Sequence, residues 1–176
     1  MTALVGSLRP GSYNLCLVTT MKERYKDRFT LETADIGVLP HFNQDEENSP
    51  PAVVQKFKQQ LAGCDGLIIA TPEYNWSVPG VLKNALDWLS RGERVLVNKP
   101  VLIVGASTGM VGTLRAQIHL RQILSSPGLS CRVLPPGGNE VLVNFTQDKV
   151  DESGRLIHQP TLAFLDDVVQ KFLSWI

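Results

Sequence analysis

Apolar segments typical of β-strands alternate along this chain with segments whose apolar residues recur at helical spacing. The strand-like runs cover residues 3–5, 29–36, 65–72, 99–107, 131–136 and 140–143. The helical patterns cover residues 13–25, 49–64, 78–92, 112–128 and 160–175. Such strict alternation predicts a parallel sheet with helices on both of its faces.

The individual runs predict the place of each strand in the sheet. Residues 65–72 and 99–107 are continuously apolar, which is typical of central strands buried on both faces. Residues 29–36 alternate apolar and polar positions, which predicts a half-exposed edge strand. The last strand is expected to be interrupted near Gly137 and Gly138. Five strands and five helices in this order predict a doubly wound, five-stranded parallel α/β sheet with strand order 2-1-3-4-5.

Length and composition limit what this domain does. The chain of 176 residues is expected to form a single domain, residues 1–176, with its own core. Its 17 basic and 17 acidic side chains balance, which argues against nucleic acid as a partner. No segment has the length and apolarity of a membrane span, and no signal-peptide pattern precedes the first strand. Three cysteines without a C-x-x-C pair predict reduced thiols, no metal site and a cytoplasmic protein.

Doubly wound sheets bind ligands beyond the carboxyl ends of their first and third strands, where the direction of winding reverses. The first of these two loops reads GSLRPGSYN, residues 6–14. Its two glycines let the backbone approach an anion closely, and a strand-to-helix turn aims backbone N–H groups at that anion. The side chains that can add hydrogen bonds or a positive charge are Ser7, Arg9, Ser12 and Asn14.

The spacing within this loop excludes two common nucleotide-binding motifs. G-x-G-x-x-G is absent, which disfavours a dinucleotide pyrophosphate site. Gly6 and Gly11 match the spacing of G-x-x-x-x-G-K-[ST], but Ser12 stands where the phosphate-binding lysine is required. A single phosphate monoester, such as the one carried by FMN, remains. The alternative interpretation is a capped helix beside a surface arginine, without a ligand.

The second loop and the helix after it read TPEYNWSVPGVLKNALDWLSR. Together with the first loop, this segment resembles the NAD(P)H-dependent FMN reductase family, which includes quinone, chromate and azo-compound reductases. That family carries G-S-L-R-x-x-S-x-N after its first strand and T-P-E-Y-N-x-S-x-P-G-x-L-K-N-A-x-D-W after its third. A third element, ASTGMVGTLRAQIHLRQIL, also matches, so the resemblance spans nearly the whole chain.

The resemblance implies a flavodoxin-like fold that binds FMN at the carboxyl edge of its sheet. It places the FMN phosphate against Ser7, Arg9, Ser12, Tyr13 and Asn14. It places the isoalloxazine along Pro72, Glu73, Tyr74 and Asn75, and the pyrimidine side of the ring near Ser107, Thr108 and Gly109. For Glu73 a second interpretation stays open, in which the side chain supports the shape of its loop.

The implied function is oxidation of NADPH or NADH, with hydride passed to FMN and then to a quinone, free flavin, chromate or azo-type acceptor. The cofactor supplies this chemistry, so neither a catalytic side chain nor a metal is expected. The choice between NADH and NADPH stays open. A flavodoxin-type electron carrier is the alternative, although such carriers have a threonine-rich phosphate loop and tend to be acidic. A binding module that has lost FMN is the third hypothesis.

The family is commonly dimeric or tetrameric, which implies a homodimer or a homotetramer. The candidate subunit contacts are Arg115, His119, Arg121 and Glu140, with solvated surface charges as the alternative. Trp76 and Ile118 stand where relatives often have tyrosine, so the preferred acceptor is not determined.

Two features of the second motif have structural interpretations. Trp88 is expected in the core, because it lies among the apolar residues of an amphipathic helix. Lys83 and Asp87 lie four residues apart and are expected to form a surface pair.

Overall fold

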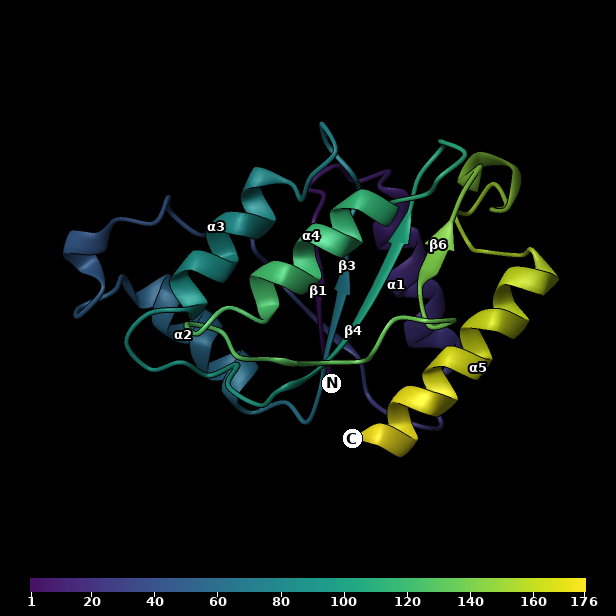
Figure 1. Ribbon diagram of the computed structural model, residues 1–176. Coiled ribbons are helices and arrows are strands. Elements are labelled where there is room, and N and C mark those ends of the chain that lie inside the picture. The colour runs from purple at the N-terminus through teal and green to yellow at the C-terminus, as the bar shows by residue number, and fades with distance from the viewer.

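A parallel β-sheet forms the middle layer of the computed structural model, which describes residues 1–176 (Figure 1). Its strands are β1 (Thr2–Val5), β2 (Glu32–Ala34), β3 (Leu67–Ala70), β4 (Pro100–Ala106), β5 (Arg132–Val133) and β6 (Val141–Val143). The helices are α1 (Tyr13–Arg24), α2 (Ala52–Ala62), α3 (Gly80–Leu89), α4 (Leu114–Leu124) and α5 (Gln159–Trp175), with short 3-10 helices η1 (Gln44–Glu46) and η2 (Thr146–Asp148). None of the helices is both long and apolar enough to cross a membrane.

The strands run in the order β2-β1-β3-β4-β5, and β6 pairs with β4 as well. This confirms the predicted doubly wound, flavodoxin-like sheet with order 2-1-3-4-5. The register of the centre is set by β1, in which Ala3 pairs with Thr33 on one side and with Ile68 on the other. Every pairing in the sheet is parallel, so the carboxyl ends of β1, β3 and β4 lie at the same edge.

The two faces of the sheet bury separate apolar cores, because neighbouring residues of a strand point to opposite faces. Ala3 and Val5 pack into the core beneath α1 and α5, and Leu4 packs into the core beneath α2, α3 and α4. Figure 1 shows these two groups of helices on opposite sides of the sheet. Trp88 is fully buried in the second core, which confirms its interpretation as a core residue.

Two strands differ from the sequence-based prediction. The edge strand β2 has three residues instead of the predicted run 29–36, and these pair with Thr2, Ala3 and Leu4 of β1, its only partner. The predicted fifth strand is divided into β5 and β6, which pair with the first and second halves of β4. Pro135 and the proline after it lack an N–H group to donate to the ladder, so the chain leaves the sheet between the two halves.

Candidate functional site

Three loops meet at the carboxyl edge of the sheet, the upper end in Figure 1, after β1, β3 and β4. They enclose a cleft of about 210 Å³ lined by Ser7, Arg9, Ser12, Tyr13, Asn14, Pro72, Glu73, Tyr74, Ala106, Ser107 and Thr108. Of the site residues predicted from the sequence, Asn75 and Gly109 do not line the cleft. Ala106 lines it without having been predicted. The structure therefore brings the other predicted residues together, and their roles toward a cofactor stay predictions.

The first loop leaves polar groups unpaired at the start of α1. The backbone N–H of Gly6 continues the ladder by donating to the carbonyl of Ala70 (2.8 Å), and the Ser12 N–H closes a turn on Arg9. Ser12 then caps α1, because its Oγ accepts from the N–H of Leu15 (3.4 Å). By contrast, the backbone N–H groups of Ser7 and Gly11, and those of the first two residues of α1, have no acceptor within the protein. These donors lie in the loop and first turn of a helix N-terminus, which favours negative charge.

Arg9 supplies the positive charge of this loop. The side chain is exposed, and its guanidinium lies 5.9 Å from the centre of the Tyr13 ring. It forms no ion pair with any carboxylate of the protein. Unpaired N–H donors and an unpaired cation fit the charge and hydrogen-bonding needs of a phosphate monoester.

Asn14 has a different position from the one that the sequence suggests. Its side chain is buried, and its amide group forms two hydrogen bonds with the backbone of Ala106: Nδ2 donates to the carbonyl (2.9 Å), and Oδ1 accepts from the N–H (3.0 Å). The amide thus pairs with the end of β4 in the way that a neighbouring strand would. Asn14 fixes the start of α1 against β4 and thereby sets the distance between the first and third loops.

The second loop forms a tight hairpin at residues 72–77, called here the hairpin loop. Tyr74 and Ser77 exchange two backbone hydrogen bonds of 3.0 Å, and the two residues between them, Asn75 and Trp76, have φ angles of +50° and +66°. Two consecutive positive φ angles are typical of a type I′ turn. The Tyr74 hydroxyl donates to Oγ of Ser7 (3.4 Å), which links the hairpin loop to the first loop. Asn75 therefore forms the turn of the hairpin.

Glu73 points toward α4. Its Oε2 accepts hydrogen bonds from the backbone N–H groups of Arg115 (2.9 Å) and Ala116 (3.1 Å), and its Oε1 lies 3.4 Å from Nη1 of Arg115. Both carboxylate oxygens are thus occupied within the protein. Of the two interpretations left open by the sequence, support of the loop is the one that these contacts favour.

The third loop is shaped largely by Ser107. Its Oγ donates to the carbonyl of Gly112 (2.9 Å) and accepts from the N–H of Gly109 (3.1 Å), so the hydroxyl holds the loop closed. Two residues before it, Gly105 has no room for a side chain, because a Cβ there would lie 1.9 Å from Oγ1 of Thr113. Thr108 lines the cleft, and unlike the hydroxyls of Ser107 and Thr113 its hydroxyl makes no hydrogen bond inside the protein. The role of Gly105 had no recognisable signal in the sequence.

The chain was compared with known proteins. The model of the NADPH-dependent FMN reductase family matches residues 1–148. This chain belongs to that family. The prediction of an oxidoreductase that uses FMN and NAD(P)H is thereby confirmed.

Individual relatives cover nearly the whole chain. A 2-hydroxy-1,4-benzoquinone reductase from Burkholderia sp is 38% identical over 100% of this chain and 95% of its own length. An NAD(P)H-dependent FMN reductase from Pseudomonas aeruginosa is 40% identical over 97% of this chain and 91% of its own. Among solved structures, the flavoenzyme FerB, an NAD(P)H:(acceptor) oxidoreductase from Paracoccus denitrificans, has a TM-score of 0.88 at 29% identity and covers 99% of this chain and 94% of its own.

In this FMN reductase the second half of the motif at residues 71–91, which lies on α3, has a structural role. Asn84 accepts from the N–H of Phe42 (2.7 Å) and donates to the carbonyl of Pro40 (2.9 Å). The indole N–H of Trp88 donates to the same carbonyl (2.9 Å). Lys83 and Asp87 form the expected surface pair, at 2.6 Å. These residues attach the segment after β2 to α3, and sequence reasoning did not predict that role for Asn84.

The four candidate subunit contacts have partners within their own chain. Arg115 pairs with Glu73, and Nδ1 of His119 lies 2.8 Å from Oγ of Ser77. Arg121 donates to the carbonyl of Leu134 (2.6 Å). The Glu140 carboxylate accepts from the N–H groups of three preceding residues, residues 137–139, and these hydrogen bonds hold its pKa below the usual value.

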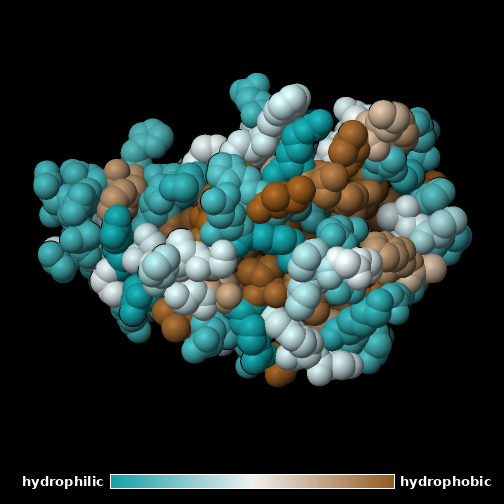
Figure 2. Space-filling model, viewed as in Figure 1, coloured by the Kyte–Doolittle hydropathy of each residue, from teal (hydrophilic) through white to brown (hydrophobic).

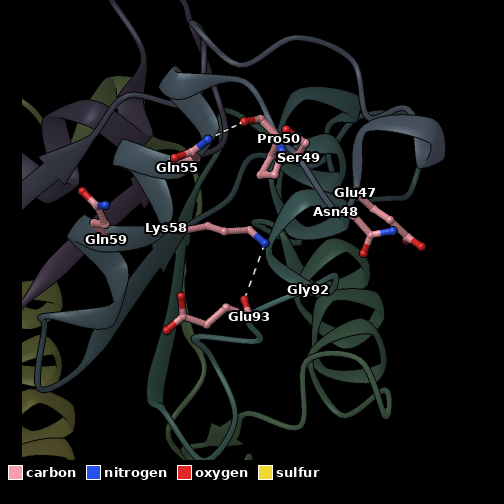
Figure 3. Close-up of a pocket in the computed structure, with 9 residues that line it drawn as sticks. All are labelled: Glu47, Asn48, Ser49, Pro50, Gln55, Lys58, Gln59, Gly92 and Glu93. Carbon is pink, nitrogen blue, oxygen red and sulfur yellow. Dashed lines mark hydrogen bonds between the residues drawn. The ribbon is translucent and has the colours of Figure 1, made fainter.

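A larger cavity of about 420 Å³ lies elsewhere, between the segment after η1, α2 and the turn after α3 (Figure 3). Most of the residues that line it are polar or charged, and Figure 3 shows Lys58 reaching from α2 toward the turn that carries Gly92 and Glu93. The Lys58 ammonium donates to the carbonyl of Arg91 (2.6 Å), and burial lowers its pKa. Lys58 therefore holds the turn after α3.

Proposed function

We propose that the cleft at the carboxyl edge holds FMN with its phosphate at residues 6–14, and that the enzyme reduces quinones with NADPH or NADH. The observation that carries this proposal is the set of unpaired backbone N–H groups at the start of α1, together with the unpaired Arg9 guanidinium. These groups lie where winding reverses, as expected for a ligand of a doubly wound sheet. Relatives named as quinone reductases support the choice of acceptor.

Each loop has a distinct task in this proposal. Residues 6–14 bind and orient the phosphate through N–H donors and Arg9, which fixes one end of the cofactor. The hairpin loop and residues 107–109 border the ring, and their backbone amides can stabilise negative charge there without a fixed cation. When bound, FMN accepts hydride from the nicotinamide and passes electrons to the acceptor. No side chain of the cleft is assigned as a general acid or base.

We expect a homodimer or homotetramer, because exposed apolar side chains gather over α4 and the loop before it (Figure 2), namely Met110, Val111 and Ile118, and the exposed Trp76 of the hairpin loop lies against Arg115 of α4. We also expect the enzyme to act in the cytoplasm, where its three unpaired cysteines remain reduced. Sedimentation of the purified protein tests the first expectation, and fractionation of the cells that make it tests the second.

The first experiment is an absorption spectrum of the purified protein, followed by anaerobic addition of NADPH or NADH and then a benzoquinone. We expect flavin bands that bleach with a nicotinamide and return with the quinone. Bleaching that only a partner protein can reverse would favour the electron carrier. A colourless protein that does not take up added FMN would overturn the proposal.

A further inference from the structure

The hairpin loop is attached to the first turns of α4 by three side chains. Glu73 accepts from the N–H groups of the second and third residues of α4, at 2.9 and 3.1 Å. The guanidinium of Arg115 lies 4.4 Å from the centre of the Trp76 ring, and His119 meets Ser77 at 2.8 Å. A loop that follows β3 is thereby fixed to a helix that follows β4.

Helix α4 depends on this attachment because its own N-cap residue does not cap it. Thr113 is fully buried, has backbone angles of φ −121° and ψ 33°, and makes no capping hydrogen bond. Its Oγ1 instead accepts from Nε2 of Gln117 (3.1 Å). The N–H groups that an N-cap side chain ordinarily satisfies are those of the second and third helical residues, which here are Arg115 and Ala116. Glu73 satisfies both from another loop, and its negative charge also suits the helix dipole.

The hairpin turn needs support of this kind. Neither Asn75 nor Trp76 is glycine, yet both have positive φ angles, +50° and +66°. Such backbone conformations are unfavourable for side-chain-bearing residues, most of all for a bulky tryptophan, and persist only where surrounding contacts hold them. The stacking of Arg115 on Trp76 and the ion pair of Arg115 with Glu73 join the two sides of this turn to one anchor.

We propose that Glu73 is a positioning residue of the flavin site, which fixes the hairpin loop by capping α4 from outside that helix. The inference rests on the proposed function, and it differs from direct contact between this side chain and the flavin. Both carboxylate oxygens already have donors, and the side chain is only 13% exposed. Its influence on FMN passes through the backbone of the hairpin loop.

The test compares Glu73→Ala with a double variant in which α4 regains a carboxylate of its own, Glu73→Ala/Leu114→Asp. Leu114 is half-buried at the first position of α4, where an acidic side chain stabilises a helix N-terminus through the helix dipole. Leu114→Asp alone controls for the lost leucine. Asp87→Ala controls for loss of a surface carboxylate within the same motif.

We expect Glu73→Ala to lower the melting temperature and to raise the Kd for FMN about tenfold, as for loss of a helix cap expressed through the binding loop. In the double variant the melting temperature should recover while the Kd stays raised. At saturating FMN, the visible circular dichroism of the bound flavin should remain different from that of the wild type. Asp87→Ala should match the wild type in both FMN measurements.

Three outcomes would overturn the inference. An unchanged Kd and flavin spectrum in Glu73→Ala would mean that the hairpin loop needs no anchor. Recovery of both melting temperature and Kd in the double variant would reduce Glu73 to a helix stabiliser. Failure of the wild type itself to bind FMN would overturn the proposed function first. Should Glu73→Ala not fold, Glu73→Gln serves in its place: its amide oxygen can still accept from the N–H groups of Arg115 and Ala116, so FMN binding close to that of the wild type is expected. A Kd raised about tenfold would show that the charge itself, and not the cap, acts on the flavin, and would contradict the inference.

Discussion

The cleft at the carboxyl edge and the polar cavity beside α2 differ in size and in the state of their polar groups. The cavity is the larger, at about 420 Å³ against about 210 Å³. Its buried lysine, however, donates to the carbonyl of Arg91, and Gln55 donates to that of Pro50. In the cleft, Arg9 forms no ion pair, and backbone N–H groups at the start of α1 have no acceptor. A free cation beside free backbone N–H groups at a helix start, more than volume, distinguishes the cleft from the polar cavity.

The two regions also differ in how the chain builds them. The cleft collects loops from three neighbouring strands, and side chains such as Asn14 and Glu73 join those loops to one another. The cavity lies at the η1 end of the molecule, which is largely polar in Figure 2. Near that end, Asn84 of α3 bonds only to the segment after β2, at Pro40 and Phe42. A change near the cavity should therefore leave FMN binding in the cleft unaffected. The following predictions test that separation.

The largest effect is expected from Asn14→Ala, with Asn84→Ala as its counterpart. Loss of the Asn14 side chain leaves the buried N–H and carbonyl of Ala106 unpaired, which should lower the free energy of unfolding by about 2–4 kcal/mol. FMN affinity of the apoprotein should fall about 100-fold, since the loops lose their spacing. Asn84→Ala should cost about 1–2 kcal/mol without changing the Kd. Urea denaturation and fluorescence titration measure both, and equal Kd values in the two variants would contradict the separation.

Arg9→Ala should have the next largest effect. Loss of a charge-assisted hydrogen bond to the phosphate should weaken FMN binding by about 1.5–3 kcal/mol, with little change in stability because the side chain is exposed. Arg155→Ala removes another exposed cation, one that pairs with Glu23, and should leave the Kd unchanged. Isothermal titration of both apoproteins decides the matter. An unchanged Kd for FMN in Arg9→Ala would show that the charge of Arg9 does not contribute to phosphate binding by the first loop.

Lys58 offers a prediction of pH dependence. Burial holds its pKa below the usual 10.5, so the native state binds fewer protons than the unfolded state as pH rises from the lowered pKa toward 10.5. The stability of the wild type should therefore rise in this range relative to Lys58→Met, from which this group is absent. Arg91, Glu47 and Glu93 surround the site in both proteins and cancel in the difference. Urea denaturation at about pH 8, 9 and 10 measures this trend, and a falling difference would contradict the sign.

The smallest effect is expected from Lys83→Ala. This exposed pair with Asp87 should contribute about 0.5 kcal/mol or less, and its loss should not change FMN binding. Thermal denaturation and a titration with FMN suffice as measurements. Weaker FMN binding would place the second half of the motif in the site after all.

Some features of the fold followed from local pattern, and others depended on partners. The alternation of apolar runs was enough to predict the sheet order, because parallel strands joined by helices admit few topologies. The short β2 could not be predicted from residues 29–36, since its length depends on how much of β1 is available for pairing. The division into β5 and β6 was indicated by the glycines near residue 137 and depends also on the two prolines there.

The sequence by itself determined the layers and the two loops at the reversal of winding, and it predicted an anion-binding role for the first loop with its arginine. Only the tertiary structure decided which of the polar atoms in those loops remain free. Asn14 finds its partner 92 residues away and Glu73 finds its partners 42 and 43 residues away, so motif spacing held no record of either contact. Hydrogen-bond partners are chosen by proximity in the folded chain, and a side chain already bonded there has little left to offer a ligand.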